Sequence, residues 1–101
     1  MAKTLITNNY TVATAGTRVQ LSATTVRLRE VVVQAKNGNS NTIYFGNSSV
    51  SSTNGFQLQP GQSFSLSELS LMTGENSFDL STMYVDAATN GDQVVIAYIP
   101  Y

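Results

Sequence analysis

The chain has 101 residues, a length typical of one domain, and a net charge of −1. It contains no Cys and no His, which excludes disulfides, thiolate metal sites and the side chain that most often moves protons in catalysis. Only 11% of the residues are charged, against about 25% in a typical domain. The net charge of −1 leaves no basic surplus of the kind that marks nucleic-acid binders.

The first nine residues precede the first β-prone run and are weakly apolar at Leu5 and Ile6. We expect residues 1–9 to form an extended arm and residues 10–101 to form a single β-sandwich domain. Such an arm can add a strand to a neighbour's sheet edge or fray in solution, and the sequence allows both. It lacks the apolar region of a signal peptide, and no run approaches the roughly 18 apolar residues of a membrane span. We therefore expect cytoplasmic synthesis and no membrane partner.

Strand signals begin with a β-prone run over residues 10–15 and an alternating run over residues 18–23. Residues 26–35 continue the alternation, but its phase changes before Val31. A shift of one residue turns every later side chain to the other face of a sheet. The pattern therefore predicts a β-bulge or a strand break near residues 29–30.

Turn chemistry separates the middle strands. Asn-Gly at residues 37–38 can take positive φ and predicts a reversal of the chain. The next strand has Ile43 and Phe45 on one face, and it leads into a long polar loop over residues 46–55 that Val50 anchors.

Pro-Gly at residues 60–61 predicts a type II turn, because Pro presets φ and Gly takes the left-handed position. An alternating strand with Phe64 and Leu66 follows. Helix signals are nearly absent, and residues 66–71 are the best candidate, with room for one turn.

The chain ends in two β-prone segments, residues 83–87 and 93–99, joined by a turn at residues 89–92. We expect them to form a hairpin. The second segment is apolar on both faces, so it is either central in a sandwich or partly covered by another chain. The fold class is therefore all-β, a single antiparallel β-sandwich or barrel of about seven to eight strands.

Candidate chemistry is sparse. Three carboxylates near the end of the chain, Asp79, Asp86 and Asp92, could hydrolyse glycosides as a pair or, with Asn90, hold calcium. Their spacing matches no known loop motif, and Asp92 is explained as a turn residue. We expect no catalytic residue, no cofactor and no metal. The five tyrosines could stack on sugars, but core or interface packing explains them better: Tyr10, Tyr44, Tyr84, Tyr98 and Tyr101.

The charges are segregated, with Lys and Arg in the first third of the chain and all acidic residues except Glu30 in the last third. They could pair within one molecule, or they could steer the basic face of one copy onto the acidic face of another.

Several segments, read in order from about Val19 to the end of the chain, resemble a family of small β-structured bacteriophage virion proteins. They are VVVQAKNGNSNTIYFGNSSVSSTNGF, LQPGQSFSL and LSTMYVDAATNGDQVVIAYI. The resemblance implies a structural virion protein, made in the host cytoplasm and carried on the particle, in the role of a capsid decoration or cement protein. A tail or fibre component, including a receptor- or carbohydrate-binding module, is the alternative. The partners implied are the major capsid protein or other virion proteins and further copies of the chain, as a trimer, with no nucleic acid.

We expect partner contacts from three regions: the arm, the loop over residues 46–55 with its flank, and the end of the chain. The residues are Lys3, Leu5, Ile6, Tyr10, Asn47, Val50, Asn54, Phe56, Tyr98 and Tyr101.

Overall fold

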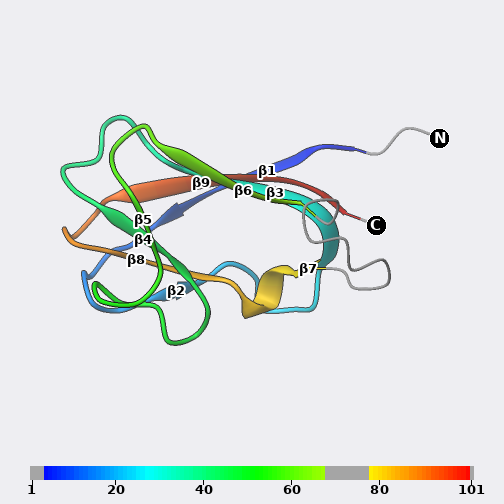
Figure 1. Cartoon of the computed structure of the whole chain (residues 1–101), viewed down its shortest axis with the longest axis horizontal. Coiled ribbons are helices and arrows are strands. Elements are labelled where there is room, and N and C mark those ends of the chain that lie inside the picture. Colours follow the sequence, from blue (N-terminus) through cyan, green and yellow to red (C-terminus); the bar gives the residue numbers. More distant parts are fainter. Residues whose placement is uncertain (1–3, 68–77, 101) are drawn as a thin grey trace.

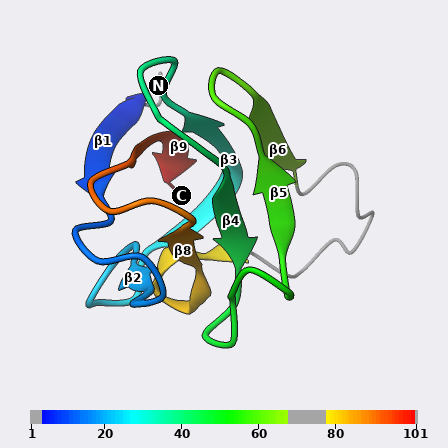
Figure 2. The ribbon, with the colours of Figure 1, turned by 90° about the vertical axis from the view of Figure 1, so that its left-hand side faces the viewer.

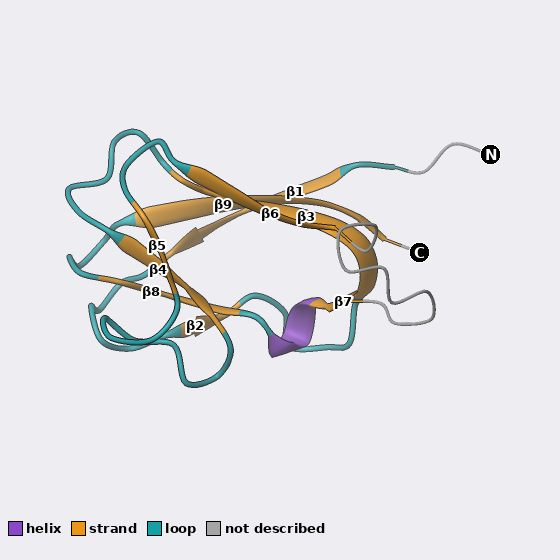
Figure 3. Ribbon diagram, viewed as in Figure 1, coloured by secondary structure: helices purple, strands orange, loops and turns teal. Residues whose placement is uncertain are grey.

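The computed structural model describes residues 4–67 and 78–100. Over these ranges the chain forms nine strands, and its one helical element is a short 3₁₀ turn, η1 (Figure 3). In chain order the elements are β1 (Ile6–Thr11), β2 (Val19–Gln20), β3 (Arg27–Ala35), β4 (Ile43–Gly46), β5 (Phe56–Leu58), β6 (Ser63–Ser67), β7 (Phe78–Asp79), η1 (Leu80–Thr82), β8 (Tyr84–Ala87) and β9 (Gln93–Pro100).

The strands form two antiparallel sheets that face each other as the upper and lower layers in Figure 1. The first sheet has the order β1-β9-β3-β6, with β7 also paired to β3, and the second has the order β2-β8-β4-β5. The pairs β1–β9, β2–β8, β3–β6 and β4–β5 are nested, as if one long hairpin had been rolled up. This is the jelly-roll arrangement. The expectation of an all-β antiparallel sandwich is confirmed.

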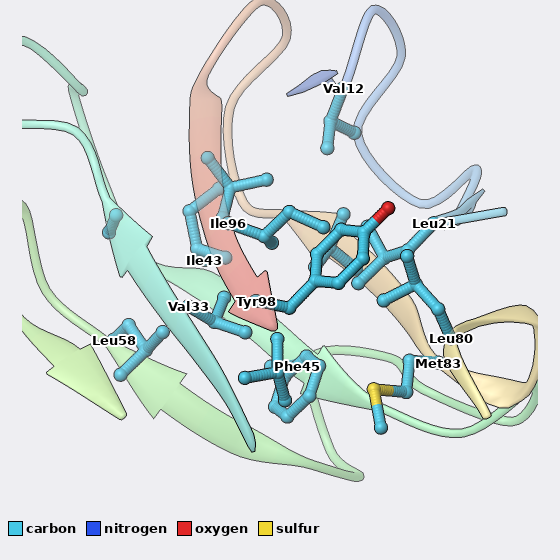
Figure 4. Close-up of a cluster of buried hydrophobic side chains, with 14 of the residues drawn as sticks. Val12, Leu21, Val33, Ile43, Phe45, Leu58, Leu80, Met83, Ile96 and Tyr98 are labelled. Carbon is cyan, nitrogen blue, oxygen red and sulfur yellow. The ribbon is translucent and has the colours of Figure 1, made fainter. Parts of the chain in front are cut away.

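The core lies between the sheets and is built by alternation along each strand, because successive side chains of a strand point to opposite faces. Val31 and Val33 of β3, Ile43 and Phe45 of β4, and Ile96 of β9 are all buried, and their outward neighbours are more exposed. Figure 4 shows Val33, Ile43, Phe45 and Ile96 packed with side chains from outside the strands: Val12 and Leu21 from connecting loops and Leu80 from η1.

The predicted break in β3 is present. The register between β3 and β9 shifts between Leu28 and Glu30, so that both Leu28 and Val31 are buried. The shift places two apolar sets of opposite phase on the same face of the first sheet, as the sequence required.

The predicted final hairpin is wrong. The turn at residues 89–92 does reverse the chain, with Gly91 at φ 86°, but β8 pairs with β2 and β4 in the second sheet. Strand β9 pairs with β1 and β3 in the first sheet. The turn therefore carries the chain from one layer to the other.

The other turns follow their sequence signals in part. Gly61 has φ 87° and Gln62 N donates to Gln59 O at 2.8 Å, as the Pro-Gly signal predicts. Asn39 N donates to Lys36 O at 3.1 Å and closes the turn after β3, but Gly38 does not take a positive φ. Of the helix candidate over residues 66–71, the first two residues belong to β6 and the rest lie outside the described residues.

The N-terminal arm is also corrected. Ile6 to Thr11 form β1, which pairs in regular antiparallel register with β9 of the same chain. Ile6 lies opposite Tyr98 and packs against the core, so this apolar position holds the segment on its own sheet. The β-prone runs predicted over residues 10–15 and 18–23 are only partly strand. Strand β1 ends at Thr11, and β2 consists of Val19 and Gln20 alone.

Candidate interaction surfaces

The outer face of the first sheet is polar at its margins and apolar along its middle. Register and alternation place twelve described side chains on it: Thr7, Asn9 and Thr11 of β1; Gln93, Val95, Ala97 and Ile99 of β9; Glu30, Val32 and Gln34 of β3; Ser63 and Ser65 of β6. Glu30 is the one charged residue among these twelve, and the exposed Arg27 and Arg29, on either side of buried Leu28, add two positive charges at the β7 end of β3.

This face explains why residues 93–99 are apolar throughout. Strand β9 is central in its sheet, and its inward side chains are buried in the core. The outward side chains Val95, Ala97 and Ile99, with Val32 on β3, are half-buried and form an apolar strip. None of these four residues is among the predicted contacts, although the two-sided apolar pattern of residues 93–99 was a signal for such a strip.

The outer face of the second sheet carries Tyr44 of β4 and Tyr84 of β8, both half-buried, with Gln57 beside Tyr44. Gly46 lies opposite Tyr84 and presents no side chain. Asp86 also points to this face but is 3% exposed, and Gly16 N, from the loop between β1 and β2, donates to its Oδ1 at 3.0 Å.

Three aromatic rings lead from the surface to the core at the margin of the sandwich formed by the edge strands β5 and β6, which a ring contact joins. Phe56 is 52% exposed and stacks on Phe64, with ring centroids 4.2 Å apart. The ring centroid of Phe64 in turn lies 6.1 Å from that of buried Phe45. Phe56 is therefore the outermost member of a packed series, and about half of it is available to a partner.

The loop over residues 46–55 is held by its own polar groups. Asn47 Oδ1 accepts from Ser49 N at 2.9 Å, and Asn54 Nδ2 donates to Ser49 O at 3.1 Å. Both asparagines are exposed, as a contact role requires. Val50 is 2% exposed and anchors the loop, so its assignment as a partner contact is wrong.

The predicted contacts at the two ends of the chain also include both exposed residues and residues packed against the core. Leu5 is exposed, whereas Ile6 and Tyr10 pack against the core, and the Tyr10 hydroxyl donates to Leu21 O. Burial raises the pKa of Tyr10 above its usual value, while a hydrogen bond with Asn8 opposes the rise.

Tyr98 is in the core, as Figure 4 shows, so its predicted contact role is wrong. Its side chain points inward because it alternates with Ala97 and Ile99 on β9. Lys3 and Tyr101 lie outside the described residues. The predicted contacts that are exposed are therefore Leu5, Asn47, Asn54 and Phe56.

The three carboxylates considered for chemistry each hold a loop. Asp92 is buried and accepts from Ser40 N and Asn41 N, both at 2.9 Å. Asp86 accepts from Gly16 N and, at 2.8 Å, from Ala87 N. Within the described ranges no group of three His, Cys, Asp or Glu residues could hold a metal ion.

Asp79 begins the 3₁₀ turn, accepting from Ser81 N at 3.0 Å and from Ser81 Oγ at 2.8 Å. These two hydrogen bonds lower the pKa of Asp79, with smaller contributions from Val26 N and the charge of Arg27. Arg27 lies opposite Asp79 in the β3–β7 pair. At this pair, charges from the two ends of the chain meet within one molecule.

No protein-family model matches the chain, and no curated protein is similar enough to count as a relative. In the part of the chain that the structure describes, no helix has the length and apolar character needed to cross a bilayer. The function therefore has to be inferred from the fold and its surfaces.

Proposed function

We propose that this chain is a structural bacteriophage virion protein, a capsid decoration or cement protein that binds and stabilises the assembled shell. The observation that carries the proposal is the outer face of the first sheet, with its apolar strip of Val32, Val95, Ala97 and Ile99 and its rim of hydroxyl and amide side chains. The charged residues of β3 lie at one end of this face, and its middle carries apolar, hydroxyl and amide groups. Because such groups cost less to remove from water than charges do, this part of the face suits a broad contact with other subunits.

Two further features support the proposal. The jelly-roll strand order occurs in viral capsid domains and in lectins, which is an argument by analogy of fold. The sequence segments after Val19 resemble small virion proteins of phages. A protein of this kind stabilises a shell by binding the assembled state more tightly than its parts. The major capsid protein is the proposed partner.

The test uses particles assembled without the chain, to which the purified protein is added, with bound protein measured by co-sedimentation. We expect saturable binding and a higher temperature of particle disruption. Val95→Lys places a charge in the middle of the apolar strip and should abolish binding. Gln57→Lys places the same charge on the outer face of the second sheet and should leave binding intact. Failure of the unmodified protein to bind, or loss of binding only with Gln57→Lys, would contradict the proposal.

A carbohydrate-binding module of a tail or fibre is the second candidate. The observation that favours it is the pair of tyrosines, Tyr44 and Tyr84, which share the outer face of the second sheet with Gln57. Aromatic rings with neighbouring amides can hold a sugar by stacking and hydrogen bonds. A glycan array with the wild-type protein and Tyr84→Ala tests this: specific binding that the substitution abolishes would favour the module over the cement protein.

A further inference from the structure

Strand β1 is an edge strand that lacks the usual protection. It pairs with β9 on one side, and no strand of the described chain lies on its other side, at the left-hand margin of the first sheet in Figure 2. All six residues from Ile6 to Thr11 are in continuous register with β9, with no bulge. The sequence ITNNYT contains no charge and no Pro. Bulges, charged side chains and Pro are common features of natural edge strands, where they prevent pairing with other chains.

Two observations show which backbone groups of β1 face away from β9. Gln93 N donates to Asn39 Oδ1, and Gln93 O accepts from Asn39 Nδ2 and Lys36 N, all on the β3 side. The backbone of Gln93 therefore faces away from Thr11, which lies opposite it in the β1–β9 register. Val12 N donates to Asp92 O at 2.9 Å, toward β9. Since backbone direction alternates along an antiparallel strand, the N–H and C=O groups of Thr7, Asn9 and Thr11 point outward.

We propose that a second copy of this chain pairs with this edge, β1 against β1, antiparallel, about a two-fold axis that passes Asn9. In this register Asn9 of one copy lies opposite Asn9 of the other, and Thr7 lies opposite Thr11. It is the register that uses all three outward-facing positions of β1, and each pair exchanges two backbone hydrogen bonds. The first sheets of the two copies join into one sheet.

The composition of the strand selects a second copy as the occupant. Self-pairing brings like residues together, which a charged strand would resist, and β1 has no charge. Thr–Thr and Asn–Asn pairs across strands can hydrogen-bond through their side chains. Leu5 is 61% exposed, directly precedes β1, and would lie against the Val12–Ala13 end of the other copy's strand. An isologous contact of this kind is the commonest in soluble oligomers.

The inference goes beyond the proposed function and does not depend on it, because it concerns the purified chain alone. It also replaces the threefold assembly that the sequence resemblance implies with a two-fold contact. If the chain does act on a shell, the joined sheets present two outer faces as one surface.

The mass of the purified protein, measured by sedimentation velocity over a range of concentrations, tests the contact. We expect a reversible dimer. Asn9→Lys puts two like charges opposite each other at the axis and should weaken the dimer about tenfold or more. Ser65→Lys adds the same charge to the same face at the other edge of the sheet and should leave the dimer unchanged. A protein that stays monomeric, or an oligomer that survives Asn9→Lys, overturns the inference.

Cross-linking tests the register independently of any loss of folding. The chain has no native Cys, so the single thiol of Asn9→Cys can be joined only to the same thiol of another copy. Cβ atoms of a hydrogen-bonded antiparallel pair are about 5.5 Å apart, more than the about 3.5–4.5 Å of an unstrained disulfide, so a short thiol-to-thiol cross-linker replaces direct oxidation. It should give a covalent dimer with Asn9→Cys and none with Ser65→Cys. A dimer in solution that does not cross-link through Asn9→Cys would exclude the proposed axis.

Discussion

The side-chain amide of Asn39 pairs with the backbone of Gln93 as a neighbouring strand would: its Oδ1 accepts from Gln93 N and its Nδ2 donates to Gln93 O, both at 2.7 Å. The adjacent Asp92 carboxylate accepts from the backbone N–H groups of Ser40 and Asn41. These four hydrogen bonds fasten the connection between β3 and β4 to the turn before β9. Both connections pass from one sheet to the other, so this network holds the two layers together at one end of the sandwich.

The first prediction concerns this network. Asn39→Ala removes two hydrogen bonds and leaves Gln93 N partly buried without its acceptor, while Gln93 O keeps its hydrogen bond from Lys36 N, so we expect the free energy of unfolding to fall by about 1–3 kcal/mol. Asn37→Ala is the matched control, because Asn37 is exposed in the same turn and its side chain lies beside Gly61, away from the Gln93 backbone. Urea denaturation of both variants measures the difference. Equal stability of the two would show that the Asn39 pair contributes nothing.

A second prediction separates two glycines by their backbone geometry. Gly55 has φ 131°, and a Cβ there would lie 2.8 Å from Phe45 O and 2.8 Å from Val50 Cγ2. Gly55→Ala should therefore destabilise the protein by about 1–3 kcal/mol. Gly38 has no atom within 4 Å of such a Cβ and no positive φ, so Gly38→Ala should be neutral or slightly stabilising. Thermal denaturation compares them, and the reverse order would contradict the account.

Local features of the fold could be predicted from the sequence, because they depend on neighbours in the chain. Alternation placed Ile43 and Phe45 on one face, which is the buried one, and the change of phase identified the irregularity before Val31. The Pro-Gly signal predicted the positive φ of Gly61. In each case a few residues determine which way a side chain or a peptide unit points.

Strand partners could not be predicted in the same way, because they depend on contacts far apart in the chain. The Gly91 turn has the same local chemistry whether the next strand joins its own sheet or the opposite one. The predictions of Tyr98 and Val50 as partner contacts were wrong for a related reason. Val50 was expected both to anchor its loop and to contact a partner, and its burial leaves only the first role. Tyr98 lies on a strand that is apolar on both faces, so only the packed structure shows that its side chain points into the core. The strip on the outer face emerges only when β9 is placed beside β3.

The third prediction follows from the pKa of Asp79, which its hydrogen bonds with Ser81 hold below the ordinary value of 3.8. A carboxyl whose pKa is lowered by folding stabilises the folded state above its unfolded-state pKa, and this contribution is lost as the pH falls through the folded-state pKa. Asp79→Asn should therefore be less stable than the wild type at pH 7, and the difference should shrink as the pH falls below about 4.

Urea midpoints between pH 7 and pH 2 measure this effect. Ser81→Ala removes the hydroxyl donor but keeps the backbone N–H group, so its own difference from the wild type should also shrink at low pH, by a smaller amount. A difference for Asp79→Asn that stays constant down to pH 2 would show that the Asp79 carboxylate has no linked proton.

The fourth prediction tests Phe56 as a partner contact separately from its packing. Phe56→Ala removes a half-exposed ring stacked on Phe64 and should cost about 1–2 kcal/mol of stability. Phe64→Ala removes the ring beneath it, which also contacts Phe45, and should cost about 2–4 kcal/mol. If Phe56 contacts a partner, binding to particles that lack the chain should fall more with Phe56→Ala than with Phe64→Ala, although the second variant is the less stable. Binding that instead follows the order of stability would assign both rings to packing alone, because a purely structural ring affects binding only through the fraction of folded protein.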